Sequence, residues 1–236
     1  MEKRDKVSYF KEGIRLAMPI AIGYVPIAIT FGLITKSSGV SNEVGIMMSI
    51  MVFAGASQFI GVNLMALGSA PLEIIVTTFI INFRHFLMSS SLSQKVKENT
   101  DKKLLYLISF GITDETFAVA SLKEEGKLNP YVILGLNFTS YLSWVFGTIF
   151  GVALGNVIPE VIKNSMGIAL YAMFIGLLVP ALKKSKPILV ISLLSIGINT
   201  LIMYIPIFAF ISKGWSIVIS TMISSLVGAL MFKEGM

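Results

Sequence analysis

The chain has 236 residues, no cysteine and a single histidine. Without cysteine there can be no disulfide, thiolate metal site or cysteine nucleophile, and one histidine is too few for a metal site built from imidazoles. No Gly-x-x-x-x-Gly-Lys-Ser/Thr loop is present, so ATP hydrolysis by this chain is not expected. No nucleophile motif is found either. We therefore expect no metal, no cofactor and no enzymatic activity.

Charge is also scarce. Only 14% of the residues are charged, 55% are hydrophobic, and the mean hydropathy is +0.82. A soluble domain could not bury that much apolar surface. The net charge of +6 comes mainly from basic residues beside apolar spans, which favours an effect on membrane orientation over nucleic-acid binding. The composition predicts an all-α polytopic membrane protein in contact with lipid, with residues 1–236 as one integral domain.

Crossing the hydrocarbon layer of a membrane takes about 20 apolar residues. The sequence contains eight hydrophobic segments, each expected to be helical or a broken helix because backbone polar groups need internal partners in lipid. The segments span residues 16–35, 44–70, 74–94, 104–122, 130–158, 165–182, 187–211 and 214–232.

The basic loops constrain how these segments cross. The tail from Met1 to Arg15 is expected to be cytoplasmic, but eight plain crossings would then place the lysines of loops 95–103 and 183–186 outside. Both conflicts disappear if segments two and six enter the membrane and return to the same side. Segment two has Gly55 and Ser57 near its middle, and segment six has Gly176 and Pro180, which suit interrupted helices.

With these two hairpins, residues 13–128 and 129–233 would form inverted repeats, each with one broken or re-entrant helix. In this arrangement the first and fifth segments run in opposite directions, and segment four crosses fully. Inverted repeats with broken helices are typical of secondary transporters, whose binding sites lie at the interruptions. Eight plain crossings are the alternative.

Two polar clusters lie inside apolar spans. Segment three contains Asn82, Arg84 and His85, and segment four contains Asp114 and Glu115 after Thr113. A charge at the membrane centre costs about 2.5–3.5 kcal/mol on insertion scales, so such groups usually face partners, water or a solute. The two segments are consecutive and antiparallel, which brings the clusters to one depth.

Two interpretations of these clusters remain open. Arg84 and Asp114 form a purely structural ion pair, or the polar groups bind an amino-acid-like zwitterion or relay a proton. His85 is the side chain here that ordinarily titrates near neutral pH, and Glu115 is a second candidate proton carrier. A neutral His85 bonded to a backbone carbonyl is equally consistent with the sequence.

Three other segments supply candidate binding residues. In segment one, Pro26 removes a helical hydrogen bond and leaves a carbonyl acceptor close to Tyr24. Near the proposed break of segment two, half-helix termini would suit a carboxylate or an ammonium group. Structural packing is the alternative for each of them. The residues concerned are Tyr24, Pro26, Phe53, Gly55, Ser57, Gln58, Asn137 and Trp144.

Several of these motifs resemble the AzlC/YgaZ family of branched-chain amino-acid permeases. The resemblance is carried by Gly23-Tyr24-Val25-Pro26, by 52–59 (Val-Phe-Ala-Gly-Ala-Ser-Gln-Phe), by Asn82-Phe83-Arg84-His85 and by Thr113-Asp114-Glu115. It is more diffuse in the C-terminal half. The sequence departs from the usual family pattern at Ala28 and in the order Gly55-Ala56-Ser57, positions that bear on the shape of the pocket.

The resemblance implies an exporter of valine, leucine and isoleucine in the bacterial cytoplasmic membrane. It also implies a small membrane subunit of the AzlD/YgaH type as partner, with this chain as the large subunit of a two-component secondary transporter. Coupling to an ion gradient, by default protons, is expected. The alternatives are a passive amino-acid channel, and a scaffold subunit whose small partner carries out transport.

Overall fold

The computed structural model describes residues 5–97, 100–121, 128–155, 175, 178–179, 182–183 and 185–232. These residues form helices, and between them only one isolated bridge, Val96 to Leu128, has strand-like pairing. The predicted all-α class is confirmed. The helices are α1 (Lys6–Ser37), α2 (Asn42–Met51), α3 (Gly55–Ala66), α4 (Pro71–Ser93), α5 (Lys102–Phe110), α6 (Asp114–Ser121), α7 (Pro130–Leu154), α9 (Lys186–Tyr204), the 3-10 turn η1 (Pro206–Phe208) and α10 (Lys213–Met231).

Five of these helices, α1, α4, α7, α9 and α10, are long and apolar enough to cross a membrane. They correspond to predicted segments one, three, five, seven and eight, which confirms a polytopic membrane protein. The count of eight segments is not confirmed. Segment six, with its expected break at Gly176 and Pro180, lies mostly outside the described residues, so its hairpin remains a prediction.

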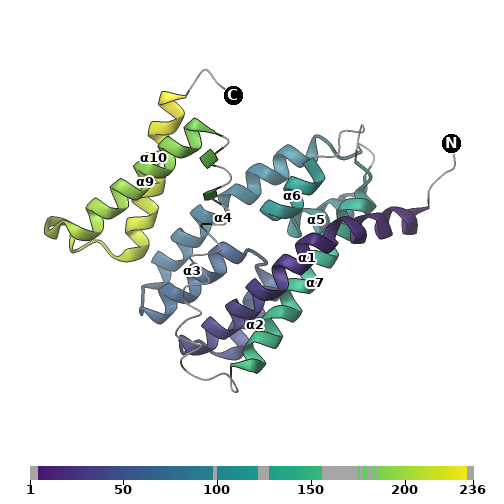
Figure 1. Ribbon diagram of the computed structural model, residues 1–236, viewed down its shortest axis with the longest axis horizontal. Helices are drawn as coiled ribbons and strands as arrows, with labels where there is room; N and C mark the ends of the chain where they lie inside the picture. The colour runs from purple at the N-terminus through teal and green to yellow at the C-terminus, as the bar shows by residue number, and fades with distance from the viewer. Residues whose placement is uncertain are drawn as a thin grey trace.

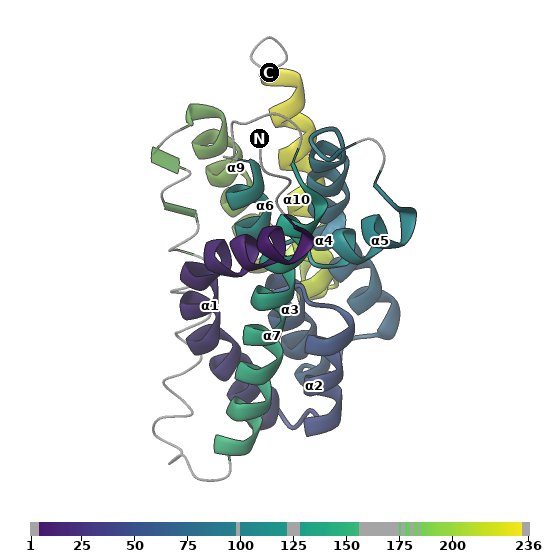
Figure 2. The same cartoon turned by 90° about the vertical axis from the view of Figure 1, so that its right-hand side faces the viewer.

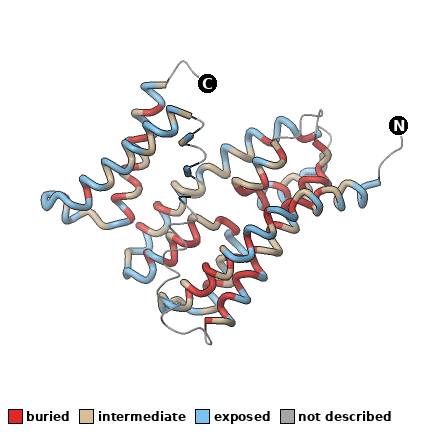
Figure 3. The backbone as a smooth tube through the Cα atoms, in the orientation of Figure 1, coloured by how far each residue is buried: buried red, intermediate tan, exposed pale blue. Residues whose placement is uncertain are grey.

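Helices α1 and α7 form the buried centre of the molecule and lie side by side in two views (Figures 1 and 2). A Cβ on Gly13 would come within 2.1 Å of the Val132 carbonyl oxygen, and one on Gly32 within 2.4 Å of the Thr148 carbonyl oxygen. Small residues thus let the two backbones touch along their length. Buried positions follow the same two helices (Figure 3).

These contacts also fix the direction of the pair. The start of α1 meets the start of α7, and the ends meet where Lys36 packs against Gly155. The two helices are parallel, whereas segments one and five were expected to run in opposite directions. Parallel packing requires the chain between them to make a net return to its starting side. The reason for the difference lies in segment four.

Segment four is a hairpin and not the full crossing that was predicted. Helix α5 ends at Phe110, residues 111–113 break the helix, and α6 runs back. Its end is tied to the loop before α5, because Lys95 Nζ donates to the Ser121 carbonyl at 2.9 Å and Leu128 N donates to the Lys95 carbonyl at 2.7 Å. Both ends of the α5–α6 hairpin therefore lie on one side.

That side is also the side of the N-terminal tail, called here the tail end. Lys6 and Tyr9 of α1 line one surface pocket together with Lys97, Asp101 and Asn129. The prediction that the tail and the 95–103 loop share a side is consistent with this arrangement.

Segment two is interrupted as predicted, with α2 ending at Met51 and α3 beginning at Gly55. The α2–α3 hairpin starts at the end opposite the tail, where a Cβ on Gly45 would meet Thr35 Cγ2 at 2.5 Å. After α3 the chain continues into α4, which runs back to the tail end. The two hairpins thus enter the molecule from opposite sides, with their breaks directed inward (Figure 1).

The α9–α10 hairpin packs on α4 at one edge of the molecule (Figure 1). Buried Glu73 of α4 accepts hydrogen bonds from Ser212 Oγ at 2.6 Å and Gly214 N at 2.7 Å, at the start of α10. A carboxylate stabilises a helix N-terminus. The division of the chain into repeats 13–128 and 129–233 remains a prediction, because it depends on segment six, but the parallel direction of α1 and α7 does not fit an inverted relation between the two halves.

Candidate substrate-binding cavity

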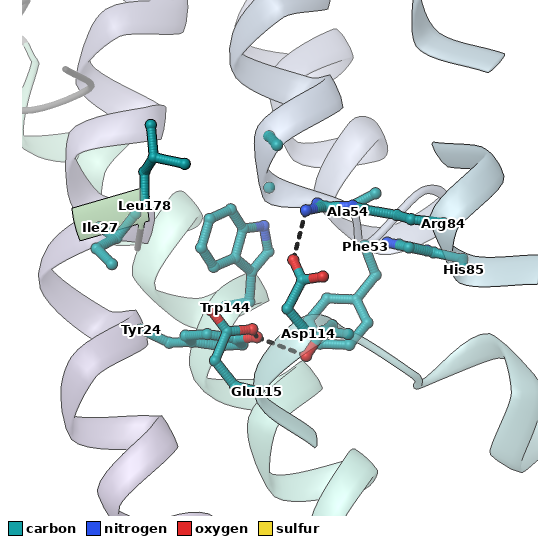
Figure 4. Close-up of a pocket in the computed structure, with 13 residues that line it drawn as sticks. Tyr24, Ile27, Phe53, Ala54, Arg84, His85, Asp114, Glu115, Trp144 and Leu178 are labelled. Atoms are coloured by element: carbon teal, nitrogen blue, oxygen red, sulfur yellow. Dashed lines mark hydrogen bonds and ion pairs between the residues drawn. The ribbon is translucent and has the colours of Figure 1, made fainter. Parts of the chain in front are cut away.

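A cavity of about 470 Å³ lies where the breaks of the two hairpins come together (Figure 4). This volume is in the range of small-molecule sites. The cavity is bordered by both breaks, by α1, α4 and α7, and by Leu178. Its lining residues are Tyr24, Ile27, Phe53, Ala54, Gly55, Ala56, Arg84, His85, Thr113, Asp114, Glu115, Trp144 and Leu178.

Phe53 forms the tip of the α2–α3 break and has a positive φ of 45°. This left-handed conformation is costly for a residue with a bulky side chain. It is held in place by edge-on aromatic contacts, with ring centroids 5.2 Å from Tyr141 and 6.4 Å from Tyr24. Phe110, at the other break, lies 6.4 Å from Phe53, so the two hairpin tips contact each other directly.

The carboxamide of Gln58 fixes the same break from inside. Its Oε1 accepts from Ala54 N at 3.1 Å and from Trp144 Nε1 at 3.0 Å, while its Nε2 donates to Ser49 Oγ at 2.9 Å. Ser49 is bonded in turn to Thr148 on α7 at 2.8 Å. These neutral groups are all buried and hydrogen-bonded, so they hold the break and the Trp144 wall of the cavity rigid.

Helix α3 then begins at Gly55 with no side-chain cap. Gly55 and Ala56 line the cavity, so the first N–H groups of the helix and its positive dipole end lie at the cavity wall. A Cβ on Gly55 would come within 2.8 Å of the Trp144 ring, which explains why glycine stands there.

The α5–α6 break is closed by threonines and an asparagine. Thr113 N donates to Thr116 Oγ1 at 2.8 Å, and Thr116 N donates to Thr113 Oγ1 at 3.3 Å, a reciprocal cap at the start of α6. From α7, Asn137 Nδ2 donates to the Ile108 carbonyl at 2.8 Å, which satisfies an acceptor left free where α5 ends. Gly111 packs directly on Asn137.

This cap places two carboxylates in the first turn of α6, at the cavity. Arg84 Nη1 lies 2.5 Å from Asp114 Oδ2, the ion pair expected from the sequence (Figure 4). Both side chains keep more than a third of their surface exposed to the cavity, and Arg84 Nε is buried without a partner. The pair is therefore open to a ligand on one side.

Glu115 has a different partner. The Tyr24 hydroxyl donates to Glu115 Oε2 and lies 2.7 Å from Thr113 Oγ1. The described residues that line the cavity include one further titratable side chain, His85, which has no hydrogen-bond partner among them. No group of three metal-ligating side chains occurs in the described part of the chain.

Eight of the thirteen predicted site residues line the cavity: Tyr24, Phe53, Gly55, Arg84, His85, Asp114, Glu115 and Trp144. Gln58 and Asn137 lie behind its walls, in the contacts described above. Ser57 donates to the Ala54 carbonyl at 3.0 Å. Pro26 is on an exposed face of α1, where its carbonyl accepts from Thr30 Oγ1 at 2.9 Å.

The fifth residue outside the cavity is Asn82, which lies on another face of α4 with Phe79, Phe83 and Phe86. Sequence reasoning did not include Ile27 or Leu178 in the site, because nothing distinguishes them from other aliphatic residues of apolar spans. Thr113 was noticed only as part of a polar cluster. Its helix-capping pattern, a threonine before two acidic residues, was the available signal.

Comparison with known proteins agrees with this arrangement of motifs. The model of the AzlC protein family matches residues 19–158, which include both breaks and the cavity residues of α1, α4 and α7. The chain belongs to the AzlC family. No solved structure matches it.

Three relatives illustrate the range of the family. The inner membrane protein YgaZ of Escherichia coli is 31% identical over 187 residues, covering 77% of this chain and 76% of that protein. The branched-chain amino acid transport protein AzlC of Bacillus subtilis is 30% identical, covering 79% and 73%. An uncharacterized membrane protein of Archaeoglobus fulgidus is 34% identical, covering 78% and 80%. The chain is thus a membrane protein of an amino-acid transport family.

Proposed function

We propose that this chain exports valine, leucine and isoleucine across the bacterial cytoplasmic membrane, as the large subunit of a secondary transporter and without enzymatic activity. The observation that carries the proposal is the cavity between two helix breaks, which has charged groups and an apolar wall. Broken helices of this kind form the binding sites of secondary transporters. The substrate named for the Bacillus subtilis relative has the same mixed chemistry.

The cavity offers a partner for each part of such a substrate. Asp114 suits the ammonium group, and Arg84 with the uncapped start of α3 suits the carboxylate. Ile27, Trp144 and Leu178 provide apolar surface for a branched side chain (Figure 4). A zwitterion inserted between Arg84 and Asp114 keeps every charge paired, which limits the cost of carrying it through hydrocarbon.

The test is efflux of preloaded radiolabelled valine from cells that lack their own exporters, with this chain expressed alone or with its small partner. Faster efflux than in control cells is expected, and Asp114→Asn should abolish it. Asp101→Asn is the matched control, since Asp101 caps α5 at the tail end and asparagine caps helices equally well. If neither condition accelerates efflux although the protein reaches the membrane, the branched-chain assignment fails.

The same assay separates the alternatives. A passive channel would show neither saturation nor acceleration of efflux by external valine, whereas a carrier shows both. A scaffold subunit would leave efflux unchanged when Asp114 is altered, because transport would occur in the partner.

We further propose a small subunit of the AzlD/YgaH type as partner, bound to the outer face of α4. The helix is largely uncovered, and Phe79, Phe83 and Phe86 surround Asn82, whose buried Oδ1 has no hydrogen-bond partner. A polar amide near the middle of a membrane helix favours contact with another helix.

This surface can be tested by cross-linking. Because the chain lacks cysteine, Phe86→Cys can be cross-linked specifically, and Leu193→Cys on exposed α9 is the control. Cross-linking of the small subunit through Leu193→Cys alone would contradict the proposal that it binds the outer face of α4.

The tail end is proposed to be cytoplasmic. It carries Lys6, Lys95, Lys97, Lys102 and Lys103, whereas the opposite end of the described helices α1 and α10 carries Lys36 and Lys213. Excess lysine marks the cytoplasmic side. A cysteine placed at Lys97 should be shielded from membrane-impermeant thiol reagents in intact cells. Labelling of this cysteine would mean that the tail end lies outside the cell.

A further inference from the structure

The described residues that line the cavity include two carboxylates, Asp114 and Glu115, and one arginine, Arg84. Arg84 is paired with Asp114, whereas Glu115 is hydrogen-bonded, among the described residues, to the hydroxyl of Tyr24. The titratable groups facing Glu115 are Tyr24 from α1, Arg84 and His85 from α4, and Asp114 beside it. Helices α3 and α7 contribute Gly55, Ala56 and Trp144 to the cavity, none of which titrates.

An uncompensated carboxylate near the middle of membrane helices is costly, and a neutral zwitterion would not balance it. A proton on Glu115 would balance it. The hydrogen-bond chain from Thr113 through Tyr24 holds Glu115 Oε2, and Oε1 has no partner among the described residues. One oxygen is thus fixed and the other can take up and release a proton.

We propose that Glu115 is the residue that carries the coupling proton, while Arg84 and Asp114 hold the amino acid. The inference rests on the transport function proposed above. The proton is bonded to Glu115 while the cavity is closed to both sides, and it leaves to water as the carboxylate forms when the cavity opens to the other side. Each transport cycle then moves one proton, and because the amino acid is net neutral, the cycle moves one positive charge.

In this proposal the two carboxylates have different roles, since Asp114 holds the amino acid and Glu115 carries the proton. Substitutions of the two residues should therefore have different effects. Glu115→Gln keeps the shape of the side chain and an oxygen to accept from Tyr24, but it resembles the protonated form permanently. Such a protein can bind and exchange amino acids, but it cannot convert a proton gradient into net transport.

The experiment uses proteoliposomes containing the full chain, with the small subunit if the efflux assay requires it. Two rates are measured: exchange of labelled valine for unlabelled valine without a gradient, and uphill valine movement driven by a pH gradient. Proton movement is followed with a trapped pH dye. For Glu115→Gln, exchange is expected to stay within about twofold of the parent, while gradient-driven transport falls at least tenfold and valine-linked proton movement disappears.

Matched variants sharpen the result. Glu73→Gln changes a buried carboxylate on α4 that lies outside the cavity, and it is expected to preserve coupling. Asp114→Asn is expected to lose exchange as well. If Glu115→Gln does not reach the membrane, Tyr24→Phe serves instead, since it removes the one donor to Glu115 found among the described residues and is expected to lower gradient-driven transport more than exchange.

The outcomes separate the two proposals. Absence of exchange in the parent protein would contradict the transport function itself. Exchange and undiminished gradient-driven transport in Glu115→Gln would leave the function intact and overturn the role of Glu115. A parent protein driven by a sodium gradient and insensitive to pH would also overturn it.

Discussion

The two hairpins that meet at the cavity each consist of two short helices and a break, but they differ in charge. The α2–α3 break contains only neutral groups, and Ala54, Ser57 and Gln58 are almost fully buried in a closed set of hydrogen bonds. The α5–α6 break leads into Asp114 and Glu115, whose carboxylates remain open to the cavity. One hairpin therefore supplies a fixed dipolar wall, and the other supplies charges whose partners can change.

This difference indicates what each hairpin requires. A closed neutral network needs every member, since an unpaired buried polar group is costly. A charged, accessible break needs a counterion, and Arg84 on α4 provides it. The α2–α3 hairpin should thus be sensitive to the loss of hydrogen bonds, and the α5–α6 hairpin to the loss of charge.

The largest effect is expected for Arg84→Ala. It leaves the cavity carboxylates Asp114 and Glu115 without a fixed cation among the described lining residues, and unpaired charge within membrane helices is costly. Valine efflux should fall to background and the amount of protein in the membrane should drop. Efflux is measured as above, and the amount of protein is measured in membranes from the same cells. Arg15→Ala, on an exposed face of α1, is the control.

The reversed pair Arg84→Asp with Asp114→Arg tests direct contact. Partial recovery of the membrane level, without transport, is expected because the ion pair is restored while its groups are exchanged. A reversed protein no better than the single variants would argue that Arg84 is needed for a solute and not for Asp114.

A smaller effect is expected for Gln58→Leu, on the neutral hairpin. The substitution leaves Ala54 N and Trp144 Nε1 buried without an acceptor, at about 1–3 kcal/mol for each. The melting temperature in detergent should fall by at least about 5 °C. Gln94→Leu, at an exposed position after α4, should leave it unchanged. An unchanged melting temperature in Gln58→Leu would mean that the network does not hold the break.

The contrast between the hairpins also explains what could be predicted from the sequence. Small residues next to Ser57 and Gln58 indicated the break in segment two, and the Arg84–Asp114 pair followed from their depth and spacing. The break in segment four was missed because Thr113, Asp114 and Glu115 were interpreted as polar groups within a helix. They are a helix start, with a capping threonine and acidic residues in the first turn.

That single error also reversed the direction expected for segment five. The parallel packing of α1 and α7 depends on glycines such as Gly32 and Gly151, which are spread over two distant segments. No local pattern shows which of two apolar helices they will face. Pairings between distant segments therefore became visible only in the structure, whereas polar groups in apolar spans already marked the site.

The smallest effect is expected for Asn137→Leu, on α7, where Asn137 supports the charged α5–α6 hairpin. It removes one hydrogen bond, to the Ile108 carbonyl, and at the same time removes Asn137 Oδ1, which is buried without a partner. The net cost should be about 1 kcal/mol, less than for Gln58→Leu.

Hydrogen exchange measures where this cost appears. In Asn137→Leu, exchange should increase in peptides covering α5 and α6 and stay unchanged in α2 and α3, the reverse of the pattern for Gln58→Leu. Asn63→Leu, on an exposed face of α3, should change neither. Faster exchange in both hairpins after either substitution would mean that the two breaks, joined through Phe53 and Phe110, open together as one unit.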